Sequence, residues 1–191
     1  MSNSQKPGNL IIISAPSGAG KTTLCRAVLS RMKNIIPSIS YTTRPSRSNE
    51  KNGVDYYFIS ENLFKGMIEK NEFSEWALVH GYYYGTQKSF LEENIQNGRD
   101  VIFNIDVQGA KNLKKQYPEA VTIFIHTPSF EELKKRLIGR KSETEKSIQK
   151  RLADAEAELK SSSAYEFHVV NDDVEKAVSQ LISIIESKRK K

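Results

Sequence analysis

The sequence has very little cysteine and no long apolar run. Its one cysteine, Cys25, excludes an internal disulfide and is typical of a protein from a reducing compartment. No apolar stretch approaches the ~20 residues that a membrane-spanning helix needs. The polar segment 1–9, followed by the short run LIII, does not have the composition of a signal peptide. We therefore expect a cytoplasmic protein that has no membrane partner.

The chain also lacks a concentrated positive surface. Lys and Arg number 29 against 23 Asp and Glu, which leaves a net charge of +6. Between residues 129 and 160, however, basic and acidic residues are interleaved at helical spacing, as on a solvated helix surface. The basic residues 188–191 are typical of a solubilising chain end. We expect no nucleic-acid partner, and both a monomer and a homo-oligomer remain open.

What the sequence does contain is a nearly complete phosphate-binding loop. The pattern is G-x-x-x-x-G-K-[ST], and residues 10–24 read LIIISAPSGAGKTTL, with alanine at the position of the first glycine. That alanine adds one methyl group at the start of the turn, whereas the two later glycines stand where a side chain would block the approach of a phosphate. A turn without a ligand is the alternative. The predicted ATP-binding residues of the loop are Ala15, Pro16, Ser17, Gly18, Ala19, Gly20, Lys21, Thr22 and Thr23.

Two side chains of the loop have specific expected roles. Lys21 would bridge the β- and γ-phosphates, and the Thr22 hydroxyl would ligate Mg²⁺. Mg²⁺ bound together with ATP is the cofactor that we expect.

Buried-strand patterns alternate with helical patterns along the chain. This order predicts an α/β fold, with a P-loop parallel sheet flanked by helices. The strand patterns lie at 10–14, 101–105, 121–125 and 167–170, and the helical patterns lie at 22–32, 110–116 and 174–185.

Two segments interrupt this alternation within a single domain, 1–191. Residues 36–97 are rich in aromatic side chains and alternate like short strands, with one helix near 63–69, which predicts an inserted mixed or antiparallel subdomain. Residues 128–160 predict a helical insertion that begins at Pro128 and Ser129. The core would then comprise about 8–35, 98–127 and 161–187.

The tetrapeptide from Asp106 to Gly109 fits the D-x-x-G switch pattern of GTPases. Such GTPases also read guanine with an N/T-K-x-D motif, and the sequence contains none. We therefore interpret this tetrapeptide as the end of a strand followed by a turn glycine.

Motifs spread over residues 8–185 resemble those of the guanylate kinase family. The resemblance implies the reaction ATP + GMP → ADP + GDP, and an architecture of core, GMP-binding insertion (about 36–97) and lid (about 128–160). The motifs are SAPSGAGKT (14–22), SYTTRPSR (40–47), NGVDYYF (52–58), EFSEWA (72–77), YYGT (83–86), IDVQG (105–109), RLIGR (136–140), KRL (150–152) and VVNDD (169–173).

The chemistry of the GMP phosphate fits the TTRPSR stretch. Arg44 and Arg47 lie three residues apart, and two guanidinium groups can hold a phosphate dianion, with the hydroxyls of Tyr56 and Tyr84 completing the site. An exposed basic turn is the alternative for this stretch.

Glu75 is the candidate for reading guanine, because a carboxylate accepts from both the N1–H and the 2-amino group. Adenine offers no such pair of donors, and a site built on these bonds can discriminate by roughly 10⁴-fold. An ordinary surface carboxylate is the alternative. The resemblance implies that Ser40, Thr86 and Asp106 also surround the base, and we expect dGMP to be accepted with GMP.

Transfer to a phosphate needs no general base, because the acceptor is already an anion. The resemblance implies that arginines of the lid approach the transferred phosphoryl group; salt bridges on a charged helical surface are the alternative. Asn171 resembles a residue near the adenine, or it ends a strand in a turn. The predicted catalytic residues are Lys21, Arg44, Arg136, Arg140 and Arg151.

The sequence departs from the family pattern at one position, and two alternative functions compete with the kinase. Asn104 occupies a position where the family usually has an acidic residue, which places metal ligands other than Thr22 in question. A peptide-binding scaffold domain of the same fold often has a degraded phosphate loop, whereas this loop keeps Lys21. A kinase for another nucleoside monophosphate is disfavoured by Glu75 together with Asp106.

Overall fold

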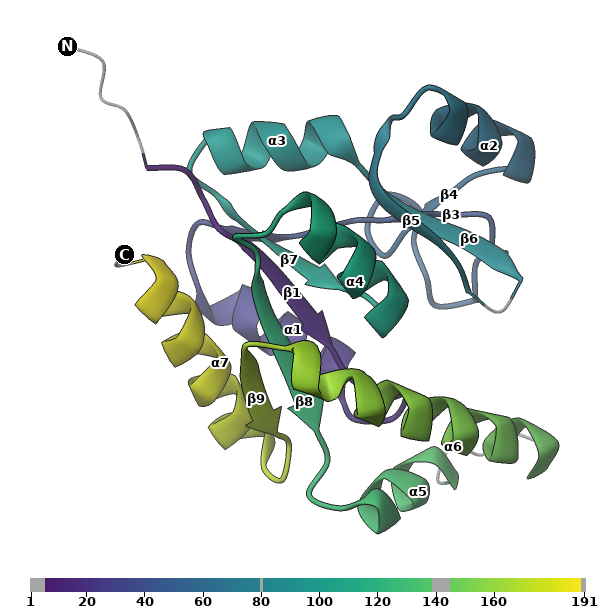
Figure 1. Cartoon of the computed structure of the whole chain (residues 1–191), viewed down its shortest axis with the longest axis vertical. Helices are drawn as coiled ribbons and strands as arrows, with labels where there is room; N and C mark the ends of the chain where they lie inside the picture. Colours follow the sequence, from purple (N-terminus) through teal and green to yellow (C-terminus); the bar gives the residue numbers. More distant parts are fainter. Residues whose placement is uncertain (1–5, 80, 139–144, 190–191) are drawn as a thin grey trace.

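The computed structural model describes residues 6–79, 81–138 and 145–189. A central sheet of five strands is flanked by helices, and two further parts project from it (Figure 1). In Figure 1 these parts, a second sheet and a pair of helices, lie at the upper and lower right of the central sheet.

The central sheet is parallel throughout, in the order β2-β7-β1-β8-β9. Such a sheet has helices on both faces, so its strands read as continuous apolar runs. The strands are β1 (Leu10–Ser14), β2 (Ile35–Pro37), β7 (Asp100–Asn104), β8 (Val121–His126) and β9 (Phe167–Val170).

Strand β1 divides the core because its side chains alternate between two faces. Ile11 and Ile13 pack in the cluster that includes residues of α1 (Lys21–Arg31) and α7 (Val174–Arg189). Leu10 and Ile12 pack in the cluster with α3 (Lys88–Gln96) and α4 (Val107–Gln116).

The second sheet has the order β4-β3-β6-β5 and is mixed, since only β3 and β4 pair in parallel. Its strands are β3 (Tyr41–Thr42), β4 (Tyr57–Phe58), β5 (Phe73–Val79) and β6 (Tyr82–Gln87). Helix α2 (Glu61–Glu69) covers it through Phe64, whose ring stacks on Phe73 and on Tyr83 with centroid separations of 4.4 and 5.3 Å. The aromatic residues that mark this segment in the sequence therefore form a small separate core.

After β8 the chain forms α5 (Phe130–Ile138), α6 (Glu145–Lys160) and a 3₁₀ turn (Ser161–Ala164) before it returns to the sheet. The Ser129 hydroxyl accepts from the Glu132 N–H at 3.1 Å, which caps α5 where the sequence predicts that a helix begins. No helix in the part of the chain that the structure describes is both long and apolar enough to cross a membrane.

The four predicted strands and the predicted α/β class are confirmed. Two elements were not predicted. Strand β2 has only three residues and ends at a proline, and the short helix α3 follows directly on an aromatic strand pattern. Both pack against β7, so their positions depend on tertiary contacts more than on local pattern.

Candidate active site

The phosphate loop is a tight turn that requires both of its glycines. The Ala19 N–H donates to the Pro16 carbonyl at 3.1 Å, and Gly18 and Gly20 have φ angles of 91° and 90°, in the left-handed region that favours glycine. A Cβ on Gly20 would lie 2.5 Å from the Asn171 amide nitrogen. Ala15, in contrast, is buried in the main core, where its methyl group packs. The missing first glycine is therefore accommodated.

The loop presents free backbone donors at the start of α1. No hydrogen-bond acceptor within the described residues reaches the N–H groups of Gly18, Gly20, Lys21 or Thr22. The first helical bond runs from the Leu24 N–H to the Gly20 carbonyl at 3.1 Å. Unpaired N–H groups at a helix N-terminus form an anion-binding site.

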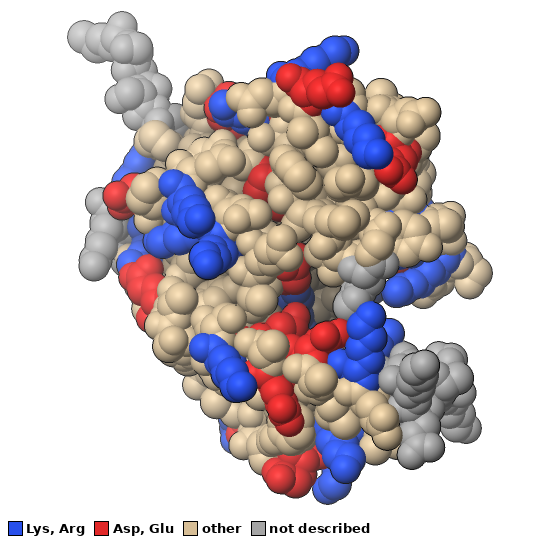
Figure 2. All heavy atoms as spheres, turned by 45° about the vertical axis from the view of Figure 1, so that its right-hand side comes forward, with Lys and Arg blue, Asp and Glu red and all other residues tan. Residues whose placement is uncertain are grey.

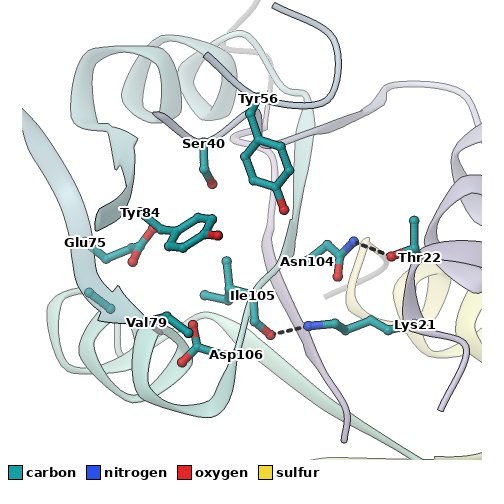
Figure 3. A pocket seen from close by; sticks show the side chains of 11 residues that line it. Lys21, Thr22, Ser40, Tyr56, Glu75, Val79, Tyr84, Asn104, Ile105 and Asp106 are labelled. Carbon is teal, nitrogen blue, oxygen red and sulfur yellow. Dashed lines mark hydrogen bonds between the residues drawn. The ribbon is translucent and has the colours of Figure 1, made fainter. Parts of the chain in front are cut away.

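Lys21 and Thr22 extend from this helix end into a pocket of about 280 Å³ (Figure 3). The Lys21 ammonium donates to the Ile105 carbonyl at 2.6 Å, and the Asn104 amide donates to the Thr22 hydroxyl at 3.4 Å. Burial lowers the pKa of Lys21, and the neighbouring Cys25, Asp106 and Glu158 oppose this effect. A bound polyphosphate would provide the missing negative charge.

The pocket brings together seven of the predicted site residues. They come from the phosphate loop, the second sheet and the end of β7: Lys21, Thr22, Ser40, Tyr56, Glu75, Tyr84 and Asp106. Asn104 also lines it, with the side chains of Ala77, Val79 and Ile105. These last three were not predicted, although Glu75, Ala77 and Val79 alternate along β5 and so share one face of the strand.

Glu75 is a buried carboxylate, with 4% of the residue exposed. A β-bulge between Phe73 and Glu75 changes the register of β5, so that Glu75 pairs with Thr86. The Thr86 hydroxyl donates to the Glu75 carboxylate at 3.0 Å and lies 3.2 Å from the Ser40 hydroxyl. Burial, assisted by the charge of Asp106, raises the pKa of Glu75 to about 7, although the Thr86 hydrogen bond lowers it.

The Asp106 side chain both caps a helix and lines the pocket. One carboxylate oxygen caps α4, accepting from the N–H groups of Gln108 and Gly109 at 2.8 and 3.1 Å. The side chain also lines the pocket beside Glu75 (Figure 3). Asp106 thus caps a helix that begins shortly after β7 ends, and Gly109 lies inside α4, so the predicted turn glycine is wrong.

Arg44 is held in place by partners of its own segment. Its guanidinium donates to both oxygens of Glu50 at 2.8 and 2.9 Å and to the Tyr84 hydroxyl at 3.2 Å, and it lies 5.5 Å from the centre of the Tyr56 ring. Burial alone would raise the pKa of Glu50. The hydrogen bonds from Arg44 and from the Arg47 N–H outweigh that effect, and the pKa of Glu50 is lowered. Glu50 was not predicted.

Arg47 does not line the pocket of Figure 3. It lies in an adjoining hollow of about 800 Å³, which shares Thr22, Asn104 and Tyr56 with that pocket.

The two predicted lid arginines that the structure describes, Arg136 and Arg151, do not line the pocket. Arg136 donates to Glu132 at 3.0 Å and to the Asn171 carbonyl at 3.2 Å, while the Asn171 amide donates to the Ala19 carbonyl of the loop at 2.8 Å. Arg151 is half-buried on α6 and does not line the pocket. Arg140 lies outside the described residues.

The surface around the pocket is hollowed, and acidic side chains lie along the hollow (Figure 2). One carboxylate that the sequence did not single out, Glu158 of α6, accepts from the Ser17 N–H of the loop at 3.3 Å. Burial raises the pKa of Glu158, and the hydrogen bond from Ser17 and the charge of Lys21 lower it.

Comparisons with known proteins agree with this geometry. The family model described as guanylate kinase matches residues 7–188. Guanylate kinase of Thermotoga maritima is 45% identical over 184 residues, which cover 96% of this chain and 89% of that protein. Guanylate kinase of Clostridium acetobutylicum is 49% identical over 180 residues, 94% of this chain and 86% of that protein.

A solved structure is also similar over almost the whole chain. The crystal structure of guanylate kinase from Anaplasma phagocytophilum superposes with a TM-score of 0.81 at 31% identity, and the match covers 98% of this chain and 89% of that one. The sequence resemblance and the fold therefore agree. The chain belongs to the guanylate kinase family, which uses ATP to phosphorylate GMP to GDP.

Proposed function

We propose that the chain phosphorylates both GMP and dGMP by direct in-line transfer from ATP, with the two nucleotides bound on opposite sides of one pocket. The observation that carries this proposal is the joint lining of the pocket by Lys21 and Thr22 from the phosphate loop and by Glu75 from the second sheet. Such a pocket brings donor and acceptor phosphates together, and positioning supplies most of the catalysis of phosphoryl transfer.

Guanine is read by Glu75. The ionised carboxylate accepts from the N1–H and the 2-amino group, and the Thr86 hydroxyl, which is itself hydrogen-bonded to Ser40, donates to it. Asp106, on the adjacent wall, adds a second acceptor. Because this set contacts the base and not the ribose, dGMP is accepted with GMP.

The phosphate of GMP is held by Arg44, Arg47, Tyr56 and Tyr84. Arg44 is already fixed by Glu50 and by the Tyr84 hydroxyl, so it is positioned before GMP arrives. Preorganised charge of this kind lowers the cost of ordering the site on binding.

ATP is held by the backbone donors of the loop and by Lys21. Mg²⁺ neutralises the phosphates when it is bound with ATP. Nowhere in residues 6–79, 81–138 and 145–189 do three His, Cys, Asp or Glu side chains form a metal-binding group. A hydroxyl such as that of Thr22, with phosphate oxygens and waters, suits Mg²⁺, which keeps several waters and few protein ligands.

The segment of about 128–160 acts as the lid and the segment of about 36–97 as the GMP-binding insertion, while about 8–35, 98–127 and 161–187 form the core. Arg136, Arg140 and Arg151 would approach the transferred phosphoryl group on closure, and an arginine in that position contributes about 10³–10⁵-fold to the rate. The adenine lies near Asn171, which already contacts the loop. Closure also excludes water.

Lys21→Met tests this division of roles. The variant should lose nearly all GDP formation yet bind GMP with unchanged affinity in calorimetry, because Lys21 serves the ATP side of the pocket. Lys111→Met, on the exposed surface of α4, is the matched control and should keep full turnover. A Lys21→Met protein that still forms GDP would refute the role of Lys21, and loss of GMP binding in the same variant would refute the two-sided pocket.

A further inference from the structure

A contact between the lid region and the phosphate loop has no part in the roles described above. Glu158, near the C-terminal end of α6, accepts from the Ser17 N–H at 3.3 Å across 141 residues of sequence. Its side chain is half-buried, and it lies near Lys21.

The turn geometry leaves the Ser17 N–H without a partner inside the turn. Within the turn the hydrogen bond runs from the Ala19 N–H to the Pro16 carbonyl, and Gly18 takes the positive φ angle, as in a type II turn. Pro16 has no N–H. Ser17 therefore carries the first donor of the turn, and Glu158 accepts it while the N–H groups of Gly18, Gly20 and Lys21 stay available to phosphate.

The same helix face that carries Glu158 also carries Arg151. Seven residues make two helical turns, so the two side chains share one face of α6 and their Cα atoms are about 10 Å apart along the axis. Ala155, between them, is fully buried in the main core. The C-terminal half of α6 is thus packed on the core, and Glu158 ties this half to the loop.

We propose that Glu158 is a positioning residue for phosphoryl transfer: its carboxylate fixes the phosphate loop in the form that ATP requires and sets the place of α6, and with it Arg151, relative to the loop. This inference rests on the proposed function for its kinetic consequence. Its structural core, a carboxylate that holds the Ser17 N–H, does not depend on catalysis.

Three variants separate the hydrogen bond from charge and folding. Glu158→Ala removes the acceptor and should lower kcat/KM for ATP roughly tenfold or more, the usual effect of losing a hydrogen bond to a charged group. The KM for GMP should change little, because no hydrogen bond or salt bridge among the described residues joins Glu158 to a residue assigned to GMP. Glu158→Gln keeps an oxygen acceptor at the same reach and should restore most of kcat/KM for ATP. Glu156→Ala removes a carboxylate from the exposed face of the same helix and should behave as the wild type.

Amide hydrogen exchange of Ser17, followed by NMR without nucleotide, provides a readout independent of turnover. Exchange should accelerate in Glu158→Ala and remain slow in Glu158→Gln and Glu156→Ala. If Glu158→Ala does not fold, Glu158→Asp replaces it, because a side chain one methylene shorter falls short of the Ser17 N–H. Equal impairment of the Ala and Gln variants, ATP kinetics of Glu158→Ala like those of Glu156→Ala, or unaltered Ser17 exchange would overturn the proposal. A wild-type protein without GMP turnover would instead count against the proposed function.

Discussion

Replacing Glu75 by glutamine should stabilise the protein while damaging its binding of GMP. The carboxyl has an ordinary pKa of 4.5, which folding raises to about 7, and each factor of ten in an acid constant corresponds to about 1.36 kcal/mol. Ionised Glu75 therefore costs the folded state up to about 3 kcal/mol at pH 8. Glutamine has no charge to bury, yet its amide oxygen can still accept from the Thr86 hydroxyl.

The direction in which the stability contribution of Glu75 changes with pH follows from proton binding. Between pH 4.5 and about 7 the folded protein keeps a proton on Glu75 that the unfolded chain has lost, so the contribution of this group to stability falls as the pH rises through that window. Near pH 4 both states are protonated and the penalty disappears. The variant should thus match the wild type near pH 4, exceed its unfolding free energy increasingly up to about pH 7, and keep that excess nearly constant to pH 8.

Urea unfolding of both proteins from pH 4 to pH 8 measures this difference. Glu69→Gln, an exposed glutamate of α2, is the matched control and should show no trend. In parallel, GMP affinity of Glu75→Gln at pH 8 should fall roughly 100-fold, because two hydrogen bonds to a charged acceptor are lost or weakened. A difference in unfolding free energy that stays constant with pH, or that grows toward acid, would refute the reasoning about burial.

The remaining predictions concern pH, the metal and the loop. In the wild type, kcat/KM for GMP should fall about tenfold per pH unit from about 7 to about 6, because the free enzyme must ionise Glu75, and more steeply below about 6, where the GMP phosphate also takes up a proton. Glu75→Gln should show only the shallower loss due to the GMP phosphate, whose pKa is about 6, and identical pH profiles would contradict the assignment. Asn104→Asp should lower the Mg²⁺ concentration required for half-maximal turnover, since a carboxylate beside Thr22 replaces an amide, with GMP affinity nearly unchanged; an unaltered Mg²⁺ titration would exclude a role for position 104. Gly20→Ala should raise the KM for ATP at least tenfold, because its Cβ would lie 2.5 Å from Asn171 at a φ angle of 90°. Gly66→Ala, where a Cβ meets no atom within 4 Å, should leave the ATP kinetics unchanged.

The sequence predicts the inner strands β1, β7 and β8 of the central sheet well because they are buried on both faces. Continuous runs such as LIIIS and VTIFI carry that signal without any tertiary information. Strand β2 has no such run, and its pairing with β7 depends on contacts between distant segments. Local pattern is therefore sufficient for the long buried elements and insufficient for the short ones.

In the candidate site, too, some residues could be identified from local sequence and others only from the fold. The phosphate loop is encoded in consecutive residues, so its glycines and Lys21 could be identified directly. Glu50 and Glu158 could not, since an acidic residue on a loop or helix usually faces water, and only the fold shows that they contact Arg44 and the Ser17 N–H. Glu75 was identified by resemblance and by its chemistry, but its raised pKa comes from the bulge and the packing that bury it.

The central claim is that one pocket joins an ATP site to a guanine-specific acceptor site. The most direct test is the release of ADP from ATP and Mg²⁺ with each nucleoside monophosphate in turn. We predict turnover with GMP and dGMP and none above background with AMP, CMP or UMP. Comparable turnover with AMP, or none with GMP in the folded protein, would contradict this account.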